Sequence, residues 1–462
     1  MLCVYKMAQI LSRTVEDLLS DFIAIRKKTL ELFKPLKIED AVMQSNSFGS
    51  PPNWHLAHVT WFFQKVLEKY GGELLHSNKG VNLEYLNSYY QQFGKILPKS
   101  ERGKFPRPTV DETLKYRAFI EEKVISFLKR TESSNKISEE IRYNFMLANQ
   151  HEMQHQELMI YDFQNYFQRF PDPEDNYKPI GGNICSTKSL AYTSRRHVEK
   201  PSGMVEISGG IYQLGYNGDG FCYDNELPEH KVYLQPFKID IAPVSNGEYI
   251  KFIEDDGYND FSYWLADGWD LLREEGWRAP LYWELKGDGD WVKKDFRGIR
   301  EIDPDEPVTN ISYYEADAYS KWAGKRLPTE AEWEKAASWN EELQEKSIYP
   351  WGNESPTSRH ANLLESSLWA PSKIGSYPDG RSYYGCHQMI GDVWEWTSSE
   401  YILYPGFRSK FAEYTNKWAI NQKVLRGGSF ATPIKQIRNS YRNYFKPHER
   451  ILFSGFRCAS DV

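Results

Sequence analysis

Two histidines four residues apart are the most distinctive candidates for chemistry in this sequence. They are His151 and His155, within NQHEMQHQE at 149–157. On a helix this spacing places both imidazoles on one face, one turn apart. Apolar residues at 147–148 and 158–159 continue that face, so both rings are expected to point inward, where each needs a partner. The pattern favours a shared metal ion over two separately hydrogen-bonded histidines.

The same segment fits the HExxH pattern of zinc metalloproteases, in which Glu152 would be the general base. The extended form of that pattern is absent, because Leu158 stands at its glycine position and no third histidine follows in register. A glutamate ligand further along would have to lie near Glu174, in a segment broken by prolines. A zinc hydrolase is therefore the weaker alternative.

A third metal ligand must come from another part of the chain. His55 and His58 lie among aromatic residues in WHLAHVTWFF at 54–63. The residues alone leave the choice between them open, and both could instead be histidines packed at an interface. Three neutral imidazoles would leave open positions on Fe(II) for substrates and O2. A site without ligand charge would also favour an incoming thiolate.

Helices must position these histidines, and the first third of the sequence has a helical pattern. Apolar residues recur at helical spacing, and Ser50 followed by two prolines resembles a helix start that Gly71-Gly72 would end. A bundle of four helices offers an interior suited to metal ligands. The sequence therefore predicts a helical domain over 1–170, with helices over 14–33, 50–70, 109–129 and 138–170.

The remaining sequence has a different texture, so the fold class predicted is a two-domain α+β protein. Residues 171–205 are turn-rich and are expected to form a connector. Residues 206–462 combine short strands and helices with long loops rich in Trp, Gly and Asn. The clearest predicted elements are strands at 209–215 and 230–234 and helices at 245–253 and 312–323.

Composition excludes several classes of protein. A chain of 462 residues exceeds a comfortable single core, and a formal net charge of -7 argues against a nucleic-acid or anionic-membrane partner. No apolar run reaches the ~18 residues of a membrane span, and no signal peptide is apparent after Met1 or the alternative start Met7. Five scattered cysteines without a CxxC pair indicate reduced thiols and a cytoplasmic protein (Cys3, Cys185, Cys222, Cys386 and Cys458).

Several motifs, in order along residues 15–460, together resemble the ergothioneine-biosynthetic sulfoxide synthases. WHLAHVTWFF, YLNSYYQQFG and HEMQHQEL resemble their DinB-type four-helix half. GGIYQLG, KRLPTEAEWEKAA, GDVWEWTSS and VLRGGSFAT resemble their C-terminal half, which is similar to formylglycine-generating enzymes and has a C-type-lectin-like fold. The oxidase chemistry of those enzymes needs a cysteine pair, whereas 427–443 contains no cysteine and Cys458 stands alone.

The resemblance implies roles for individual residues. It implies Fe(II) ligands at His58, His151 and His155, with His55 as a packing residue or a residue behind the ligands. It also implies that Gln154 and Asn443 contact the histidine-derived substrate. Further candidates for substrate binding are Arg442, Tyr444 and Phe445, with Arg107 and Arg457 as weaker carboxylate binders.

The NSYY segment resembles one that carries active-site tyrosines in a subgroup of this family. A phenol at the site of O2 reduction can deliver a proton, although Tyr89 and Tyr90 could equally be loop packing. Because neighbouring side chains in a loop often point apart, we expect only one of the two to donate directly.

The implied reaction joins the sulfur of cysteine or γ-glutamylcysteine to the imidazole of hercynine, using O2. The subgroup that takes γ-glutamylcysteine carries an acidic and then a basic residue where this chain has Phe445 and Glu449, although Arg450 lies one residue away. Free cysteine is therefore favoured. The alternatives are 5-histidylcysteine sulfoxide synthesis of the ovothiol type, a selenium donor, or a non-catalytic binding protein.

Overall fold

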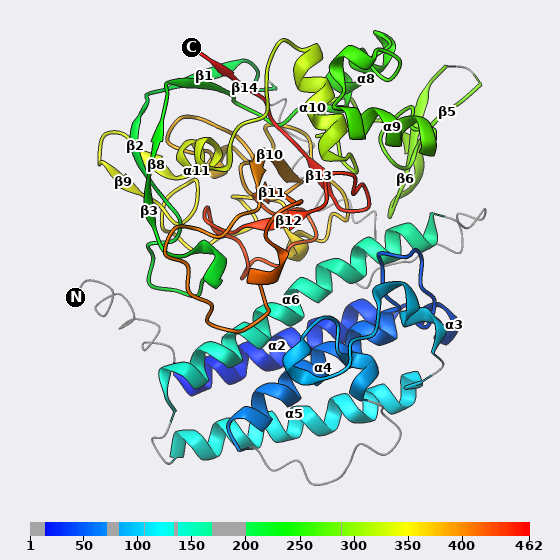
Figure 1. Cartoon of the computed structure of the whole chain (residues 1–462), viewed down its shortest axis with the longest axis vertical. Helices are drawn as coiled ribbons and strands as arrows, with labels where there is room; N and C mark the ends of the chain where they lie inside the picture. Colours follow the sequence, from blue (N-terminus) through cyan, green and yellow to red (C-terminus); the bar gives the residue numbers. More distant parts are fainter. Residues whose placement is uncertain (1–13, 72–82, 106, 134–136, 169–199, 288) are drawn as a thin grey trace.

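The computed structural model describes residues 14–71, 83–105, 107–133, 137–168, 200–287 and 289–462. Long helices form one part of the molecule and a mixed α+β part lies against them (Figure 1). The predicted α+β class is thereby confirmed. Most of the predicted connector lies outside the described residues, and β1 begins at Met204, inside the predicted span. The domain boundaries remain predictions.

In the described ranges of the first part there are four long α-helices and one short one, and the four predicted helices are confirmed. Thr14 caps the first by accepting from Asp17 N, and Ser138 caps the last by accepting from Ile141 N. The third helix runs four residues beyond its predicted end, and the fourth ends three residues earlier than predicted. The helices are α2 (Val15–Phe33), α3 (Ile38–Ala41), α4 (Pro52–Lys69), α5 (Val110–Ser133) and α6 (Glu139–Phe167).

Ser50 does not cap α4, and that detail of the prediction is wrong. Pro51 occupies the N-cap position without a side-chain hydrogen bond. Because Pro51 and Pro52 lack an N–H group, fewer donors at this helix start need a partner. Ser50 instead accepts from Arg102 Nη1 at 2.8 Å, and its own N–H donates to Asp162 Oδ2 at 3.0 Å.

The second part contains several small sheets joined by long loops. One sheet has four strands in the order β12-β11-β10-β13, and two sheets have three strands each, in the orders β1-β4-β14 and β5-β6-β7. The strands are β1 (Met204–Ile207), β2 (Gly210–Leu214), β3 (His230–Leu234), β4 (Phe237–Asp240), β5 (Trp283–Leu285), β6 (Trp291–Asp295), β7 (Gly298–Glu301), β8 (Trp339–Asn340), β9 (Glu345–Lys346), β10 (Trp394–Glu400), β11 (Lys423–Arg426), β12 (Asn443–Phe445), β13 (Ser454–Gly455) and β14 (Ala459–Asp461). The helices are α8 (Asn246–Glu254), α9 (Ala266–Glu275), α10 (Tyr313–Trp322) and α11 (Glu330–Ser338).

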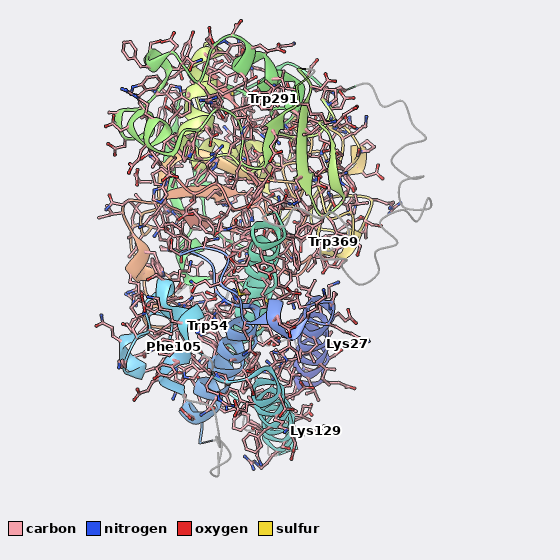
Figure 2. The ribbon with its side chains drawn as sticks, turned by 90° about the vertical axis from the view of Figure 1, so that its right-hand side faces the viewer. Lys27, Trp54, Phe105, Lys129, Trp291 and Trp369 are labelled. Carbon is pink, nitrogen blue, oxygen red and sulfur yellow. The ribbon has the colours of Figure 1, made fainter. Side chains whose placement is uncertain are left out.

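Helix α6 lies at the interface between the two parts. Figure 1 shows it as the bundle helix that faces the α+β part, and Figure 2 places Trp54 on the bundle side and Trp369 on the other. The buried carboxylate of Glu157 accepts from Trp394 Nε1 at 2.8 Å and from Ser429 Oγ at 2.5 Å. Thr432 Oγ1 donates to it at 2.9 Å. A single carboxylate on α6 therefore anchors strand β10 and the loop that carries Ser429 and Thr432.

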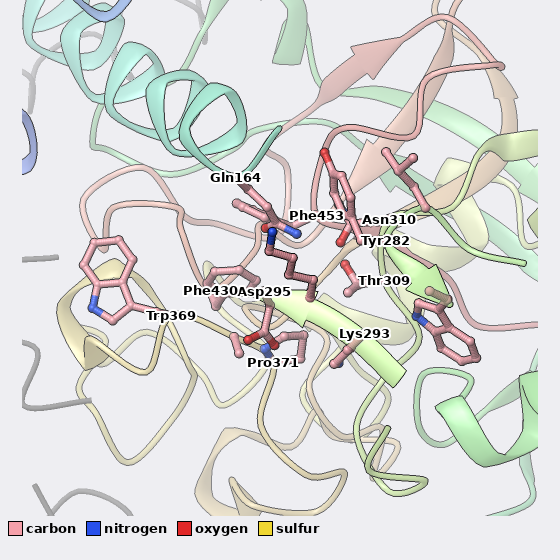
Figure 3. Close-up of a pocket in the computed structure, with 14 residues that line it drawn as sticks. Gln164, Tyr282, Lys293, Asp295, Thr309, Asn310, Trp369, Pro371, Phe430 and Phe453 are labelled. Carbon is pink, nitrogen blue, oxygen red and sulfur yellow. The ribbon is translucent and has the colours of Figure 1, made fainter. Parts of the chain in front are cut away.

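The C-terminal end of α6 is anchored as well. Lys294 Nζ donates to the carbonyl oxygen of Gln168 at 3.1 Å. Gln164 borders a cavity of about 10 Å³ lined also by Phe430 and Phe453 (Figure 3). That volume holds about one water molecule, so this cavity is no substrate site.

None of the helices in the described ranges is long and apolar enough to cross a membrane.

Candidate metal centre

Three histidines from two helices meet in the interior of the bundle. His58 comes from α4, and His151 and His155 come from α6; one ligand nitrogen of each lies within 4.8 Å of the others. Their ring centroids are 4.5–5.0 Å apart, with 5.0 Å between His58 and His151. All three side chains are buried. These are the residues that the family resemblance implied, and the structure brings them together.

His58 is held in one orientation by its surroundings. Its Nδ1 lies 2.6 Å from the carbonyl oxygen of Leu86, which can only accept, so Nδ1 carries the proton. Nε2 is then left with a free lone pair. The ring stacks on Trp54 at 4.5 Å with an interplanar angle of 10°. The indole and the carbonyl together present His58 to the other two histidines.

His151 packs against Phe62, with ring centroids 4.3 Å apart. Its Nδ1 is buried and has no hydrogen-bond partner among the described residues. Such an orphaned polar atom is costly in a folded protein unless something else binds the ring. The environment of His151 therefore suits metal ligation better than a hydrogen-bonded core histidine.

Burial keeps the three rings neutral. It lowers the pKa of His151 to about 3 and holds the pKa of His58 and His155 well below the ordinary value. Neutral imidazole is the form that binds a metal ion. The donor set consists of three uncharged nitrogens, which fits Fe(II), Zn(II) or Co(II).

His55 lies behind His155 and is not part of the cluster. Its Nδ1 is 2.7 Å from His155 Nδ1, and its Nε2 is 3.1 Å from Asp162 Oδ2. Asp162 was missed by the sequence analysis. It lies seven residues after His155 on the same helix, two turns away, and that spacing was the available signal.

The two tyrosines of NSYY point the same way, so the expectation that they point apart is wrong. Their hydroxyl oxygens are 3.1 Å apart and their ring centroids 4.3 Å apart. Asn87 explains this arrangement, because its side chain accepts from Tyr90 N at 3.0 Å and donates to Tyr90 O at 2.7 Å, which folds the loop back. Burial raises the pKa of Tyr89 to about 12 and that of Tyr90 well above its ordinary value.

A loop of the second part covers the histidines. The ring of Tyr414 lies 5.8 Å from that of His151, and its hydroxyl donates to Gln154 Oε1 at 2.6 Å. Gln154 Nε2 donates in turn to Tyr441 OH at 3.2 Å. Phe411 adds a ring 5.2 Å from Phe62. Sequence reasoning missed Phe411 and Tyr414, because aromatic residues in an irregular loop have no diagnostic spacing.

The other predicted substrate residues lie on β12. Asn443 and Phe445 are half-buried on one face of that strand, and Asn443 Oδ1 accepts from Tyr444 N at 2.9 Å. Tyr444 stacks on Tyr401 at 3.9 Å. Its phenol is near enough to interact electrostatically with that of Tyr89. The described side-chain contacts of Tyr444 are therefore with other tyrosines.

Arg442 was predicted to bind substrate, but its side chain is buried and bonded to other residues of the protein. Its buried guanidinium pairs with Glu330 at 3.0 Å and donates to the carbonyl oxygens of Asn225 and Ile402. It also lies 4.1 Å from the ring centroid of Tyr404. With these partners it holds loops together. The weaker candidates are likewise occupied, since Arg457 pairs with Glu395 and Arg107 with Glu112.

A different arginine lies beside the centre. The guanidinium of Arg102 is 3.7 Å from the ring centroid of Trp54, on the indole that also stacks on His58. Its Nε has no hydrogen-bond partner among the described residues, and the nearby carboxylate of Asp162 favours its charged form. Burial lowers its pKa to about 9, so the group remains a cation at neutral pH. Nothing in the segment KSERGK signalled this position.

Glu152 cannot be the general base of a zinc hydrolase. Its buried carboxylate accepts from Arg26 at 3.0 Å, from Thr29 at 2.7 Å and from Arg117. Burial alone would raise its pKa, but Arg117 and Arg26 lower it to about 2. The carboxylate is committed to the bundle core, so the HExxH reading is wrong.

Family models match most of the chain. Residues 21–159 match the DinB superfamily, and residues 190–462 match the sulfatase-modifying factor enzyme 1-like domain. The two matches correspond to the helical part and the α+β part.

Two curated relatives that are similar over nearly the whole chain are hercynine oxygenases. The hercynine oxygenase of Mycolicibacterium smegmatis is 32% identical over 97% of this chain and 99% of the relative. That of Mycolicibacterium thermoresistibile is 32% identical over 96% of this chain and 95% of the relative. The formylglycine-generating enzyme of Thermomonospora curvata is 31% identical over 57% of this chain and 95% of the relative. Similarity over both parts, together with the three clustered histidines, shows that this chain belongs to the hercynine oxygenase family of enzymes.

Proposed function

We propose that this protein is an iron(II)-dependent sulfoxide synthase that joins the sulfur of cysteine to the imidazole of hercynine. One imidazole C–H bond and the cysteine S–H bond break, and one C–S bond forms. C–S bond formation and sulfur oxidation each remove two electrons, which together reduce one O2. One oxygen atom enters the sulfoxide and the other leaves as water, so no further reductant is needed. The observation that carries the proposal is the triad of neutral histidines in a chain of this family.

Iron fits the donor set of His58, His151 and His155. The three nitrogens are uncharged, buried and mutually close, and His151 Nδ1 lacks another partner among the described residues. Fe(II) would supply the O2 activation that protein side chains cannot provide.

Residues of both parts would hold hercynine. Gln154, fixed by Tyr414 and Tyr441, is placed one turn from His151 and can present its amide to the substrate. The trimethylammonium group has no N–H to donate, so aromatic faces are its natural partners. Phe62, Phe411 and Tyr414 supply such faces beside His151.

Tyr90 and Tyr89 would supply a proton during O2 reduction. Both phenols remain protonated at neutral pH, because burial raises their pKa. Their hydroxyls form a pair, so Tyr89 can pass a proton to Tyr90 after Tyr90 has donated its own.

Cysteine is the proposed thiol. The buried Arg102 cation lies beside the centre and offers an ionic partner for one carboxylate. A second carboxylate would need another cation, but Arg450 pairs with Glu315 at 2.9 Å. Phe445 and Glu449, at the positions that matter for γ-glutamylcysteine, cannot replace it.

We also propose a cytoplasmic location. Cys222, Cys386 and Cys458 are free thiols in the structure, as expected in a reducing compartment.

A substrate panel tests the proposal. Fe(II)-loaded protein is supplied with O2 and each pair of hercynine or histidine with cysteine or γ-glutamylcysteine, and products are identified by mass spectrometry. We expect hercynine with cysteine to give the highest kcat/KM. Preference for γ-glutamylcysteine would contradict the thiol assignment, and preference for histidine would favour the ovothiol-type reaction. No product from any pair would contradict the proposed function.

A further inference from the structure

A chain of hydrogen bonds connects the metal centre to a buried carboxylate. His155 Nδ1 lies 2.7 Å from His55 Nδ1, and His55 Nε2 lies 3.1 Å from Asp162 Oδ2. His155 and Asp162, at the two ends of this chain of hydrogen bonds, lie on α6, and His55 between them lies on α4. All three side chains are at least nine-tenths buried, with relative exposures of 8%, 3% and 6%.

These hydrogen bonds allow one arrangement of protons that leaves a free lone pair on His155 at the metal centre. A carboxylate only accepts, so His55 Nε2 must carry its proton. A neutral His55 then accepts through Nδ1, and His155 Nδ1 must donate to it. His155 Nε2 is left unprotonated, as a metal ligand requires. The reverse arrangement would turn an N–H of His155 toward the centre and a lone pair of His55 toward the carboxylate.

The local backbone is shaped around Asp162. Ser50 N donates to Oδ2 at 3.0 Å, and Ser45 Oγ lies 3.5 Å from Oδ1. A Cβ atom at Gly49 would lie 2.1 Å from Oδ1, so a side chain there would displace the carboxylate. The loop before α4 therefore closes over Asp162, which fixes the end of the chain.

We propose that Asp162, acting through His55, fixes the tautomer and ring orientation of His155 and thereby sets the metal affinity of the three-histidine site. Both are positioning residues, since neither belongs to the ligand cluster. Carboxylate–histidine pairs behind a ligand raise its basicity, and their loss commonly weakens metal binding ~10–100-fold. The inference rests on the proposed function only in requiring that the site bind a metal ion.

Metal affinity tests the proposal without any turnover. Full-length wild type, Asp162→Leu and Asp162→Asn are titrated with Co(II) against a chromophoric chelator under anaerobic conditions. We expect Asp162→Leu to weaken Co(II) binding by ~10–100-fold. Asp162→Asn keeps an acceptor oxygen for His55 and is expected to lose less. His55→Phe, which leaves His155 Nδ1 without an acceptor, tests the same link if Asp162→Leu does not fold.

A matched control separates positioning from general destabilisation. Thr60 lies on α4, is fully buried, accepts from Arg26 and donates to the carbonyl oxygen of Leu56. Thr60→Val is expected to lower thermal stability while its Co(II) Kd stays within ~3-fold of wild type. NMR of the Zn(II)-loaded protein with ¹⁵N-labelled histidine adds a direct reading, with His155 bound through Nε2 and protonated at Nδ1 in the wild type.

The outcomes distinguish this inference from the proposed function. Tight Co(II) binding by wild type and equally tight binding by Asp162→Leu and His55→Phe would overturn the inference alone. Binding of His155 through Nδ1 would overturn it as well. Failure of wild type to bind one metal ion per chain would overturn both.

Discussion

At the scale of single residues, burial sets the protonation states on which the proposed chemistry depends. It keeps the three histidines neutral and keeps the two phenols of Tyr89 and Tyr90 protonated. Three uncharged nitrogens that could bind a metal ion thus share the interior of the molecule with two protonated phenols. Burial lowers the pKa of Arg102 to about 9, and the group remains a cation at neutral pH.

Removing the hydroxyl of Tyr90 should slow sulfoxide formation. Tyr90 packs against Phe62, which also contacts His151, so its hydroxyl is the better placed of the pair. We expect Tyr90→Phe to lower kcat by ~100-fold or more, and Tyr89→Phe to have a smaller effect, because it only supports Tyr90. Tyr85→Phe, on a ring stacked against Phe105, is the control. Wild-type rates in both variants would show that neither phenol donates.

The pH dependence of the rate follows from the same pKa shifts. A phenol whose pKa is raised stays protonated until the pH rises through that raised value, which for Tyr89 is about 12. We therefore expect no loss of kcat from tyrosine ionisation between pH 7 and ~10. A fall in kcat in this range that disappears in Tyr90→Phe would contradict the assignment.

The helical spacing of the histidines made them predictable from the sequence. The residues around them lie in segments without regular spacing and were not predictable. His151 and His155 repeat at helical spacing on an apolar face, which can be read from sequence. Arg102 and Tyr414 come from irregular segments, so only three-dimensional packing brings them to the centre. Nothing in the sequence indicated that Arg442 is already paired, because its buried partner Glu330 is 112 residues away.

At the scale of elements, side chains on three sides of α6 have three different roles. His151 and His155 face the metal centre, Glu152 faces the bundle core, and Glu157 faces the α+β part. The helix and its start were predictable, because Ser138 precedes a long stretch of helix-compatible sequence. The sequence could not predict which segments bind Glu157, because their residues are more than 230 positions away.

Replacing Glu152 should cost stability and leave metal binding intact. Glu152→Gln leaves the buried Arg26 and Arg117 with only the partly exposed Glu121 as a countercharge, so we expect a loss of ~3–5 kcal/mol in urea unfolding. The exposed pair of Glu140 and Lys69 gives the control, Glu140→Gln, with an expected loss below ~1 kcal/mol. A Co(II) Kd unchanged in Glu152→Gln is expected.

Lowering the pH should weaken the same interaction of Glu152 with Arg26 and Arg117. The pKa of Glu152 is lowered to about 2 in the folded protein, so its stabilisation is present above the ordinary value of 4.5 and is lost as pH falls toward 2. The urea midpoint of wild type should therefore fall more steeply between pH 4.5 and 2.5 than that of Glu152→Gln. Parallel pH curves for the two proteins would contradict this account.

At the scale of the whole molecule, the site needs both parts. The three candidate metal ligands come from α4 and α6, while Tyr414 and Tyr441 reach Gln154 from the α+β part. The order of the parts and the class of fold could be predicted from the motifs. The sheet topology could not, because strands such as β4 and β14 pair residues more than 200 positions apart.

Breaking the Glu157 contacts should separate substrate binding from metal binding. Glu157→Leu leaves the donors of Trp394, Ser429 and Thr432 unpaired, so we expect the covering loops to shift and hercynine binding to weaken by ~10-fold or more. The Co(II) Kd should stay within ~3-fold. Asp21→Asn, which removes a more exposed contact between the parts at Lys435, is the control. Unchanged hercynine affinity, measured by calorimetry, would contradict the role assigned to Glu157.

The central claim is that the three histidines hold an iron ion that couples O2 reduction to C–S bond formation. The most direct measurement is the stoichiometry of O2 uptake and ¹⁸O incorporation by Fe(II)-loaded protein given hercynine and cysteine. We predict one O2 consumed and one ¹⁸O atom incorporated per sulfoxide formed, with both abolished in His155→Ala. O2 uptake without a hercynine–cysteine product, or equal product from His155→Ala, would contradict the claim.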